Sequence, residues 1–135
     1  MNRHFLDTNV VIYAYSNTEI KKSNRANELL FNDHSIISTQ VVNEFSNVCL
    51  RKFRQPEQTI IKTLLELAQT TTIANFSLAT QLEALKLCEA HCFSYYDALI
   101  VATAMENECA ILYSEDMQDG QLINGRLRIL NPFVS

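Results

Sequence analysis

Hydrophobic and polar residues follow one another in two alternating patterns along the chain. Short, mostly apolar runs predict strands at residues 4–7, 35–38, 70–73, 110–113 and 128–130. Between them, apolar residues three or four positions apart predict one helix from about Val10 and others over about 21–31, 39–53, 56–68, 78–90 and 96–106. Because such alternation requires crossover connections, we expect an α/β fold of three layers, with helices on both faces of a mainly parallel sheet of about four to five strands.

The composition is that of a folded protein with one core. Of the 135 residues, 47% are hydrophobic and 19% are charged, and only two glycines and two prolines are present. Such a chain has enough apolar surface for a sizeable core, and no segment is long or polar enough to serve as a linker. We therefore expect residues 1–135 to form a single domain.

The termini and the cysteines indicate a cytoplasmic protein without a membrane association. No basic segment leads into a long apolar stretch, so neither a secretory signal nor a membrane span is predicted. Three of the four cysteines lie among apolar residues, as reduced, buried thiols do. A zinc site at Cys88, His91 and Cys92 is the alternative, but it lacks a second pair of ligands at a usable spacing.

Two aspartates are expected at the carboxyl ends of strands. Asp7 follows His4-Phe5-Leu6, and Asp116 follows the strand at 110–113 in an acidic loop that also holds Glu115 and Asp119. In an open parallel sheet, ligands bind beyond the carboxyl ends of the strands. Taken alone, each aspartate has a simpler explanation, since Asp7 suits a helix cap and acidic loops are usually solvated surface.

Two further acids fall on helices. Glu44 stands beside the apolar stripe of its helix, which consists of Val41, Val42, Phe45, Val48 and Cys49. We expect its carboxylate to be buried and in need of a cation, unless it lies at a rim with access to solvent. Asp97 opens a helix that is apolar on nearly every side, so its first turn should be buried too. A partner for the helix dipole is the simpler interpretation of Asp97.

A parallel sheet brings these four acids to one edge, where they would repel one another. A hard cation such as Mg²⁺ or Mn²⁺ relieves that repulsion, because these ions prefer oxygen ligands. An ion held in this way can activate water and stabilise charge on a phosphodiester, which is the chemistry of a nuclease. Thr8, Asn9 and Ser114 are candidate supports of the acids through hydrogen bonds, although each also suits a turn or a cap.

The motifs that carry these residues resemble those of the PIN-domain family in order and spacing. They are Phe5-Leu6-Asp7-Thr8-Asn9-Val10, the mid-chain Glu44, the segment from Ser94 to Ala104 around Asp97, and Leu112-Tyr113-Ser114-Glu115-Asp116. Within that family, the length and single-domain form are similar to those of the VapC toxins of toxin-antitoxin pairs. The resemblance covers essentially the entire chain, and the segment around Asp97 is its most specific part.

The resemblance implies a Mg²⁺- or Mn²⁺-dependent endoribonuclease, often a homodimer, that is silenced by a small VapB-like antitoxin. It assigns metal binding to Asp7 and Asp97, and completion of the acidic site to Glu44 and Asp116. Asp119 is a second acid in the last loop, so either Asp116 alone or both residues serve the metal. Asp116 is the preferred assignment.

The net charge of −4 argues against a broad electrostatic grip on nucleic acid, so contacts with RNA must be local. Ordinary solvated surface is the alternative for each basic residue. Concentrated basic residues occur in two places, namely Lys21, Lys22 and Arg25, and Arg51, Lys52 and Arg54, of which the second set is our candidate RNA contact.

Other functions are compatible with parts of the pattern. A nuclease of RNA processing that is no toxin, or a catalytically silent protein that binds only nucleic acid or an antitoxin, would share the fold. A phosphoaspartyl phosphatase or receiver domain would also place an Asp at the end of the first strand. The sequence lacks the second acid such sites need near Asp7, where position 9 is Asn, and no Lys follows Lys86.

Overall fold

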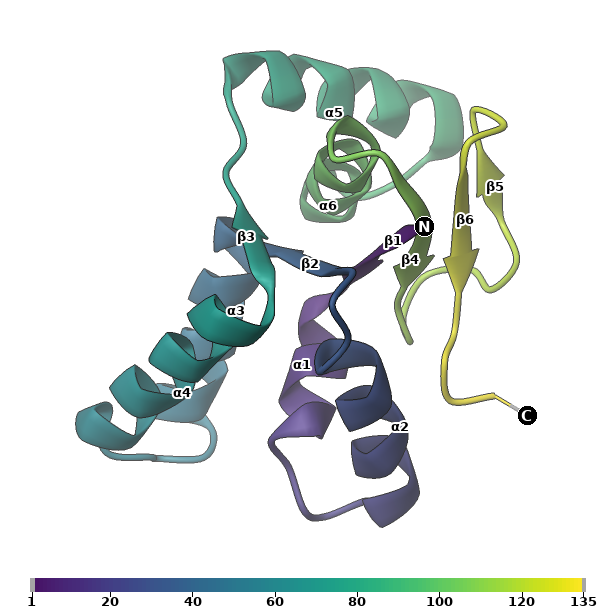
Figure 1. The fold of residues 1–135 in the computed structure, drawn as a ribbon. Coiled ribbons are helices and arrows are strands. Elements are labelled where there is room, and N and C mark those ends of the chain that lie inside the picture. The colour runs from purple at the N-terminus through teal and green to yellow at the C-terminus, as the bar shows by residue number, and fades with distance from the viewer. Residues whose placement is uncertain (1, 135) are drawn as a thin grey trace.

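A sheet of six strands runs through the middle of the protein, with helices on both sides of it (Figure 1). The structure is a computed structural model and describes residues 2–134. The strands are β1 (Arg3–Leu6), β2 (Ser35–Ser38), β3 (Thr72–Ala74), β4 (Cys109–Tyr113), β5 (Leu122–Ile123) and β6 (Leu127–Leu130). Their order is β3-β2-β1-β4-β6-β5, and all neighbours are parallel except β5 and β6.

Pairs of helices connect β1 to β2, β2 to β3 and β3 to β4. The helices are α1 (Thr8–Ala14), α2 (Ile20–Leu30), α3 (Thr39–Arg51), α4 (Glu57–Thr70), α5 (Leu78–His91) and α6 (Tyr95–Glu106). In Figure 1, α5 and α6 lie above the sheet and α1 and α2 below it, while α3 and α4 form an arm at one side. The predicted three-layer α/β fold is therefore confirmed. Among the described residues, no helix has both the length and the apolar character that crossing a bilayer requires.

Burial explains why the central elements were readable in the sequence. All four residues of β2 are buried, and so are Phe5 and Leu6 of β1, as expected for strands that are covered on both faces. In α6, seven consecutive residues, 98–104, are buried, so this helix is enclosed on nearly every side. These elements form the core against which the more amphipathic helices pack.

The sheet is larger than the four to five strands we expected. The additional strand is β5, which has only two residues and pairs antiparallel with β6. The hairpin turns at Asn124 and Gly125, which both adopt positive φ (51° and 68°), as a type I′ turn requires. Near the opposite edge, α4 extends to Thr70, so β3 begins at Thr72 rather than Thr70.

The apolar stripe of α4 is only partly buried, contrary to its amphipathic pattern. Ile60 and Leu67 are buried, whereas Ile61 and Leu65 are 48% and 61% exposed. The reason is the position of α4 in the arm at the side of the sheet, where the helix has less of the molecule to cover it (Figure 1). The arm is tied back by Tyr15, whose hydroxyl donates to Glu66 Oε1 at 2.8 Å.

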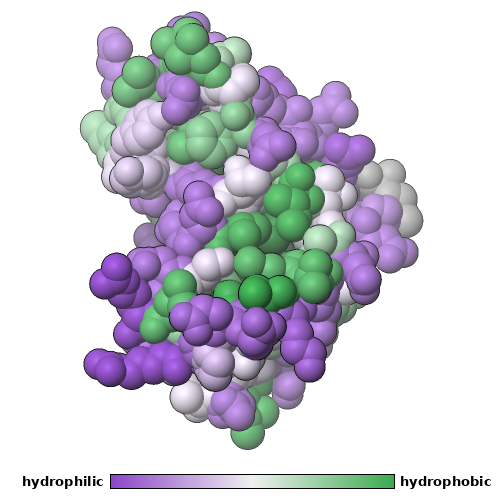
Figure 2. Space-filling view, turned by 90° about the vertical axis from the view of Figure 1, so that its left-hand side faces the viewer, coloured by the Kyte–Doolittle hydropathy of each residue, from purple (hydrophilic) through white to green (hydrophobic). Residues whose placement is uncertain are grey.

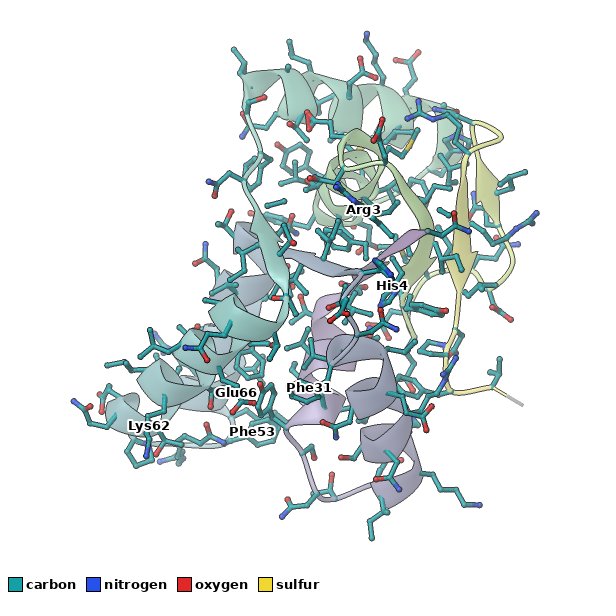
Figure 3. All side chains as sticks on the ribbon, in the orientation of Figure 1. Arg3, His4, Phe31, Phe53, Lys62 and Glu66 are labelled. Carbon is teal, nitrogen blue, oxygen red and sulfur yellow. The ribbon has the colours of Figure 1, made fainter. Side chains whose placement is uncertain are left out.

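Aromatic side chains fill the space between this arm and the α1–α2 pair. The ring of Tyr15 packs edge-on against Phe31 and tilted against Phe45, with centroids 6.4 and 5.7 Å apart. Figure 3 shows Phe31, Phe53 and Glu66 gathered in this region. These contacts fix how the arm stands beside α1, and therefore where α3 lies relative to the carboxyl end of β1.

Candidate functional site

The strand order reverses between β1 and β4, which are neighbours although three strand-to-strand crossovers separate them in sequence. Leu6 pairs with Tyr113 at the carboxyl ends of these strands, and the Asp7 amide donates to Tyr113 O at 3.0 Å. The first residues beyond the two strands, Asp7 and Ser114, are therefore adjacent. Such a switch point is where open α/β sheets bind ligands.

Asp7 is buried at this point, with a side chain that is held on both oxygens. The residue is 7% exposed and forms the N-cap of α1, where Oδ1 accepts from the Thr8 amide at 2.7 Å. Oδ2 accepts from the Ser114 hydroxyl at 2.7 Å. Burial raises the pKa of Asp7 to about 6 despite both hydrogen bonds, because the buried anion loses its hydration.

Two further predicted acids are electrostatically coupled to Asp7. The charges of Asp97 and Glu44 both raise the pKa of the Asp7 carboxyl, in addition to the larger effect of burial. Asp97 is the third residue of α6 and is half-buried, with its amide donating to the Ser94 hydroxyl at the helix cap. The structure thus brings the first strand and the starts of α3 and α6 to one acidic edge.

The expected burial of Glu44 is wrong, because this side chain is exposed. The buried stripe of α3 consists of Val41, Phe45 and Cys49, and Glu44 lies about 100° around the helix from Phe45. Glu44 is therefore at the rim, the alternative that the sequence left open. Likewise, the first turn of α6 at Asp97 is only half-buried, since the helix is enclosed from Ala98 onward.

Gln40 holds Glu44 in place at that rim. Its Nε2 donates to Glu44 Oε1 at 3.0 Å and to the Tyr96 carbonyl oxygen at 3.2 Å, so it joins α3 to the first turn of α6. Gln40 is itself buried. Gln40 was not among the residues predicted from the sequence, although an amide one helical turn before an acid is a usable signal.

The loop after β4 places its acids in different directions. Asp116 Oδ2 accepts from Asn9 Nδ2 at 3.0 Å, and the Asp116 amide donates to the Ser114 hydroxyl oxygen at 3.3 Å, which links it to Asp7. Asp119 Oδ1 instead accepts from the Asn131 amide at 2.8 Å, near the carboxyl end of the described chain. Asp116 therefore belongs to the network around Asp7, and Asp119 does not.

The neighbouring Glu115 is engaged elsewhere. Its carboxylate accepts from the Tyr13 hydroxyl at 2.9 Å and forms an ion pair with Lys22. The Glu115 amide donates to Asn9 Oδ1, so Asn9 joins α1 to the loop after β4 through both ends of its amide group. This bridge fixes the loop that carries Asp116 against α1.

The carboxylate oxygens at this edge are ligands that a hard divalent cation prefers, although they do not form a complete coordination shell. Within residues 2–134, no group of three or more His, Cys, Asp or Glu side chains is placed so that it could hold a metal ion. Mg²⁺ keeps several waters and often takes only one or two protein carboxylates directly. Asp7 fits that demand, because burial and two acidic neighbours make its negative charge costly until a cation arrives.

The two sets of basic residues differ in whether their members form ion pairs. Lys22 pairs with Glu115 and Glu19, and Arg25 pairs with Glu28. None of the ion pairs formed within residues 2–134 involves Arg51, Lys52 or Arg54, which are all exposed at the end of α3 and in the loop after it. We refer to these three residues as the basic turn.

A groove opens beside the acids. Its volume is about 510 Å³, and it is lined by Gln40, Asn43, Glu44, Asn47, Phe76, Tyr96 and Leu99. Of these residues, only Glu44 was predicted from the sequence to be functional. The spacing of Gln40, Asn43, Glu44 and Asn47 by three or four residues was a signal for a shared polar face of α3.

Comparison with known proteins finds a matching family and similar folds. The family model of the PIN domain matches residues 4–118 of the chain. A toxin-antitoxin complex from Klebsiella pneumoniae contains a chain of similar structure, with a TM-score of 0.74 and 23% identity over 96% of this chain and 98% of that one. Comparison with curated protein sequences found no match.

Two other solved structures are similar over most of their length. VapC20 of Mycobacterium tuberculosis, described as a sarcin-ricin loop cleaving toxin, has a TM-score of 0.67 and 16% identity over 84% of this chain and 89% of that one. DNA-bound VapBC from Salmonella typhimurium has a TM-score of 0.67 and 15% identity over 96% and 97%. At such identities these likenesses establish a shared fold.

Proposed function

The chain belongs to the PIN domain family, and from this premise we propose that it is a divalent-metal-dependent endoribonuclease, the toxin of a toxin-antitoxin pair. The single observation that carries the proposal is the buried Asp7 carboxylate at the switch point, coupled to Asp97 and Glu44. A receiver domain or phosphatase would use the same aspartate as a nucleophile, but the second acid that such sites need near it is missing, and no Lys follows Lys86.

The residues have separate roles in this proposal. Asp7, Asp97 and Asp116 would hold Mg²⁺ or Mn²⁺, directly or through water. The ion would activate water and stabilise the charge that develops on the phosphodiester. Ser114 keeps Asp7 oriented, and its hydrogen bond favours the ionised carboxylate by lowering the pKa. Asn9 orients Asp116 by donating a hydrogen bond from its side-chain amide to Oδ2.

Glu44 is positioned to handle water and protons at the rim of the site. Gln40 fixes Glu44 Oε1, so Oε2 is left for a water molecule that approaches from solvent. An exposed carboxylate in this position can accept a proton from water as it attacks. Thr8 supports Asp7 through its backbone amide, whereas its buried hydroxyl has no partner among the described residues.

Substitution of Asp97 tests the function directly. We expect Asp97→Asn to reduce cleavage of single-stranded or looped RNA by at least 100-fold, because the ion loses a ligand. The measurement is single-turnover cleavage with Mg²⁺ or Mn²⁺, together with a circular dichroism melt to show that the domain stays folded. Undiminished cleavage by the Asp97→Asn protein would contradict the assignment.

The two acids of the last loop form a matched pair for the same assay. Asp116→Asn should lower activity strongly, whereas Asp119→Asn should leave it close to that of the wild type, because Asp119 binds the Asn131 amide. A wild type that binds RNA but never cleaves it, at any metal concentration, would instead favour the catalytically silent alternative.

We further propose that the protein forms a homodimer and binds a small antitoxin. Neighbouring structures are described as toxin-antitoxin complexes, and exposed leucines on α5, which are Leu78, Leu82 and Leu85, supply apolar surface for a protein contact. Light scattering of the purified chain should give twice the mass of 15.4 kDa. Co-expression with the product of a small neighbouring gene should abolish RNA cleavage, and unchanged cleavage would count against the toxin role.

A further inference from the structure

The groove beside the acidic site combines hydrogen-bonding amides with aromatic surface. Asn43 and Asn47 lie four residues apart on α3 and present donors and acceptors from one face of the helix. Tyr96 is 68% exposed, immediately before Asp97 in the chain, and Phe76 lines the groove from the connection between β3 and α5. Figure 2 shows a hollow in the surface on this side, between the upper part of the molecule with α5 and the lower part with α3 and α4.

Gln40 lines the same groove and is incompletely paired. The residue is 7% exposed, and its Oε1 has no hydrogen-bond partner among the described residues. The orientation of the amide is settled, because Nε2 contacts two acceptors, Glu44 Oε1 and the Tyr96 carbonyl. A buried acceptor without a donor is costly.

We propose that the groove is a subsite for one unstacked nucleobase of the RNA, next to the bond that is cleaved. This inference rests on the proposed ribonuclease function and extends it to the choice of sequence. The base stacks on the exposed ring of Tyr96, while Asn43 and Asn47 read the donors and acceptors on its edge. The substrate class is thus RNA with an unpaired nucleotide, because bases inside an A-form helix cannot reach such a groove.

The physical chemistry of nucleobases matches what the groove offers. Single-stranded RNA is recognised by stacking of splayed bases on aromatic rings and by hydrogen bonds to their edges. The amide groups of Asn and Gln carry both a donor and an acceptor, which suits a base edge better than a phosphate. The exposed acid Glu44 in the lining of the groove also disfavours a phosphate inside it. The RNA backbone must therefore pass beside Asp7, Asp97 and Asp116, while the base enters the groove.

The experiment compares cleavage of four RNA hairpins that differ only in one unpaired loop nucleotide. We expect the wild type to prefer one base, Asn47→Ala to reduce that preference at least fivefold, and Tyr96→Ala to lower cleavage of all four about tenfold. Tyr96→Phe, which keeps the ring, should retain cleavage. Asn24→Ala on α2, an exposed amide outside the groove, is the matched control and should behave like the wild type.

The possible outcomes separate this inference from the proposed function. Cleavage with a base preference that survives both Asn47→Ala and Tyr96→Ala would overturn the subsite while the ribonuclease function stands. If the wild type cleaves nothing, binding of a fluorescent single-stranded hexanucleotide decides. Affinity that falls about tenfold in Tyr96→Ala and not in Asn24→Ala supports the subsite, and equal affinity in all proteins overturns it.

Discussion

At the scale of single residues, Asp7 makes the stability of the metal-free protein depend on pH. Folding raises the pKa of this carboxyl from 3.8 to about 6, so the folded protein binds the proton more tightly than the unfolded chain. The stabilisation that this proton provides is complete below pH 3.8 and is lost as the pH rises through 6. At neutral pH the ionised carboxyl therefore costs up to about 3 kcal/mol.

The comparison of wild type with Asp7→Asn isolates this effect, because asparagine does not titrate. Without metal, we expect the variant to be the more stable protein at pH 7.5, by a margin that shrinks as the pH falls to 5. Urea denaturation in EDTA measures both free energies of unfolding. A margin that is independent of pH would mean that Asp7 titrates normally in the folded protein.

The residue scale also shows where inference from the sequence succeeded and failed. Asp7 was placed correctly because a short apolar run ends before it, and a parallel strand end has only one location in such a fold. Glu44 was placed on the correct helix, but its burial was wrong, because an offset of one residue turns a side chain by about 100°. Gln40 escaped notice, since its role depends on α6, which is distant in sequence.

At the scale of elements, the end of α5 is strained at Cys92, which adopts a left-handed conformation with φ 59°. Glycine occupies this position without the steric penalty of a side chain. We expect Cys92→Gly to raise the free energy of unfolding by about 0.5 kcal/mol, once the larger entropy of the unfolded glycine is included. Thermal melting measures the change, and Cys92→Ala, which removes only the thiol, should not be stabilised.

The elements themselves were predictable to the extent that local pattern determines them. The strand at 35–38 was identified with the bounds that the structure has, and so was the start of α5 at Leu78, because burial and capping mark them locally. The strand β5 was missed, since two residues carry no periodicity. Asn124-Gly125 was a usable signal for its hairpin. The exposure of Ile61 was unpredictable, because it depends on how the arm stands away from the sheet.

At the scale of the whole molecule, charge is distributed unfavourably for binding RNA. The net charge is −4, and part of the acidic charge is gathered at the proposed catalytic edge, so long-range attraction to phosphates is weak. In the other basic set, Lys22 is paired with Glu115 and Arg25 with Glu28. The basic turn is therefore the part of the surface from which we expect a phosphate contact.

The salt dependence of RNA binding tests whether the basic turn makes that contact. Each phosphate neutralised on a single strand contributes about −0.7 to the slope of log K against log salt. Replacing all three basic-turn residues by Gln should therefore reduce the slope by about 2, measured by fluorescence anisotropy with the Asp97→Asn background to prevent cleavage. The matched control replaces Lys21, Lys62 and Lys86 by Gln, which changes the net charge equally at dispersed exposed sites. Equal slopes in the two triple variants would mean that only net charge matters. A smaller slope in the basic-turn variant alone would mean that this acidic protein binds RNA through one local patch.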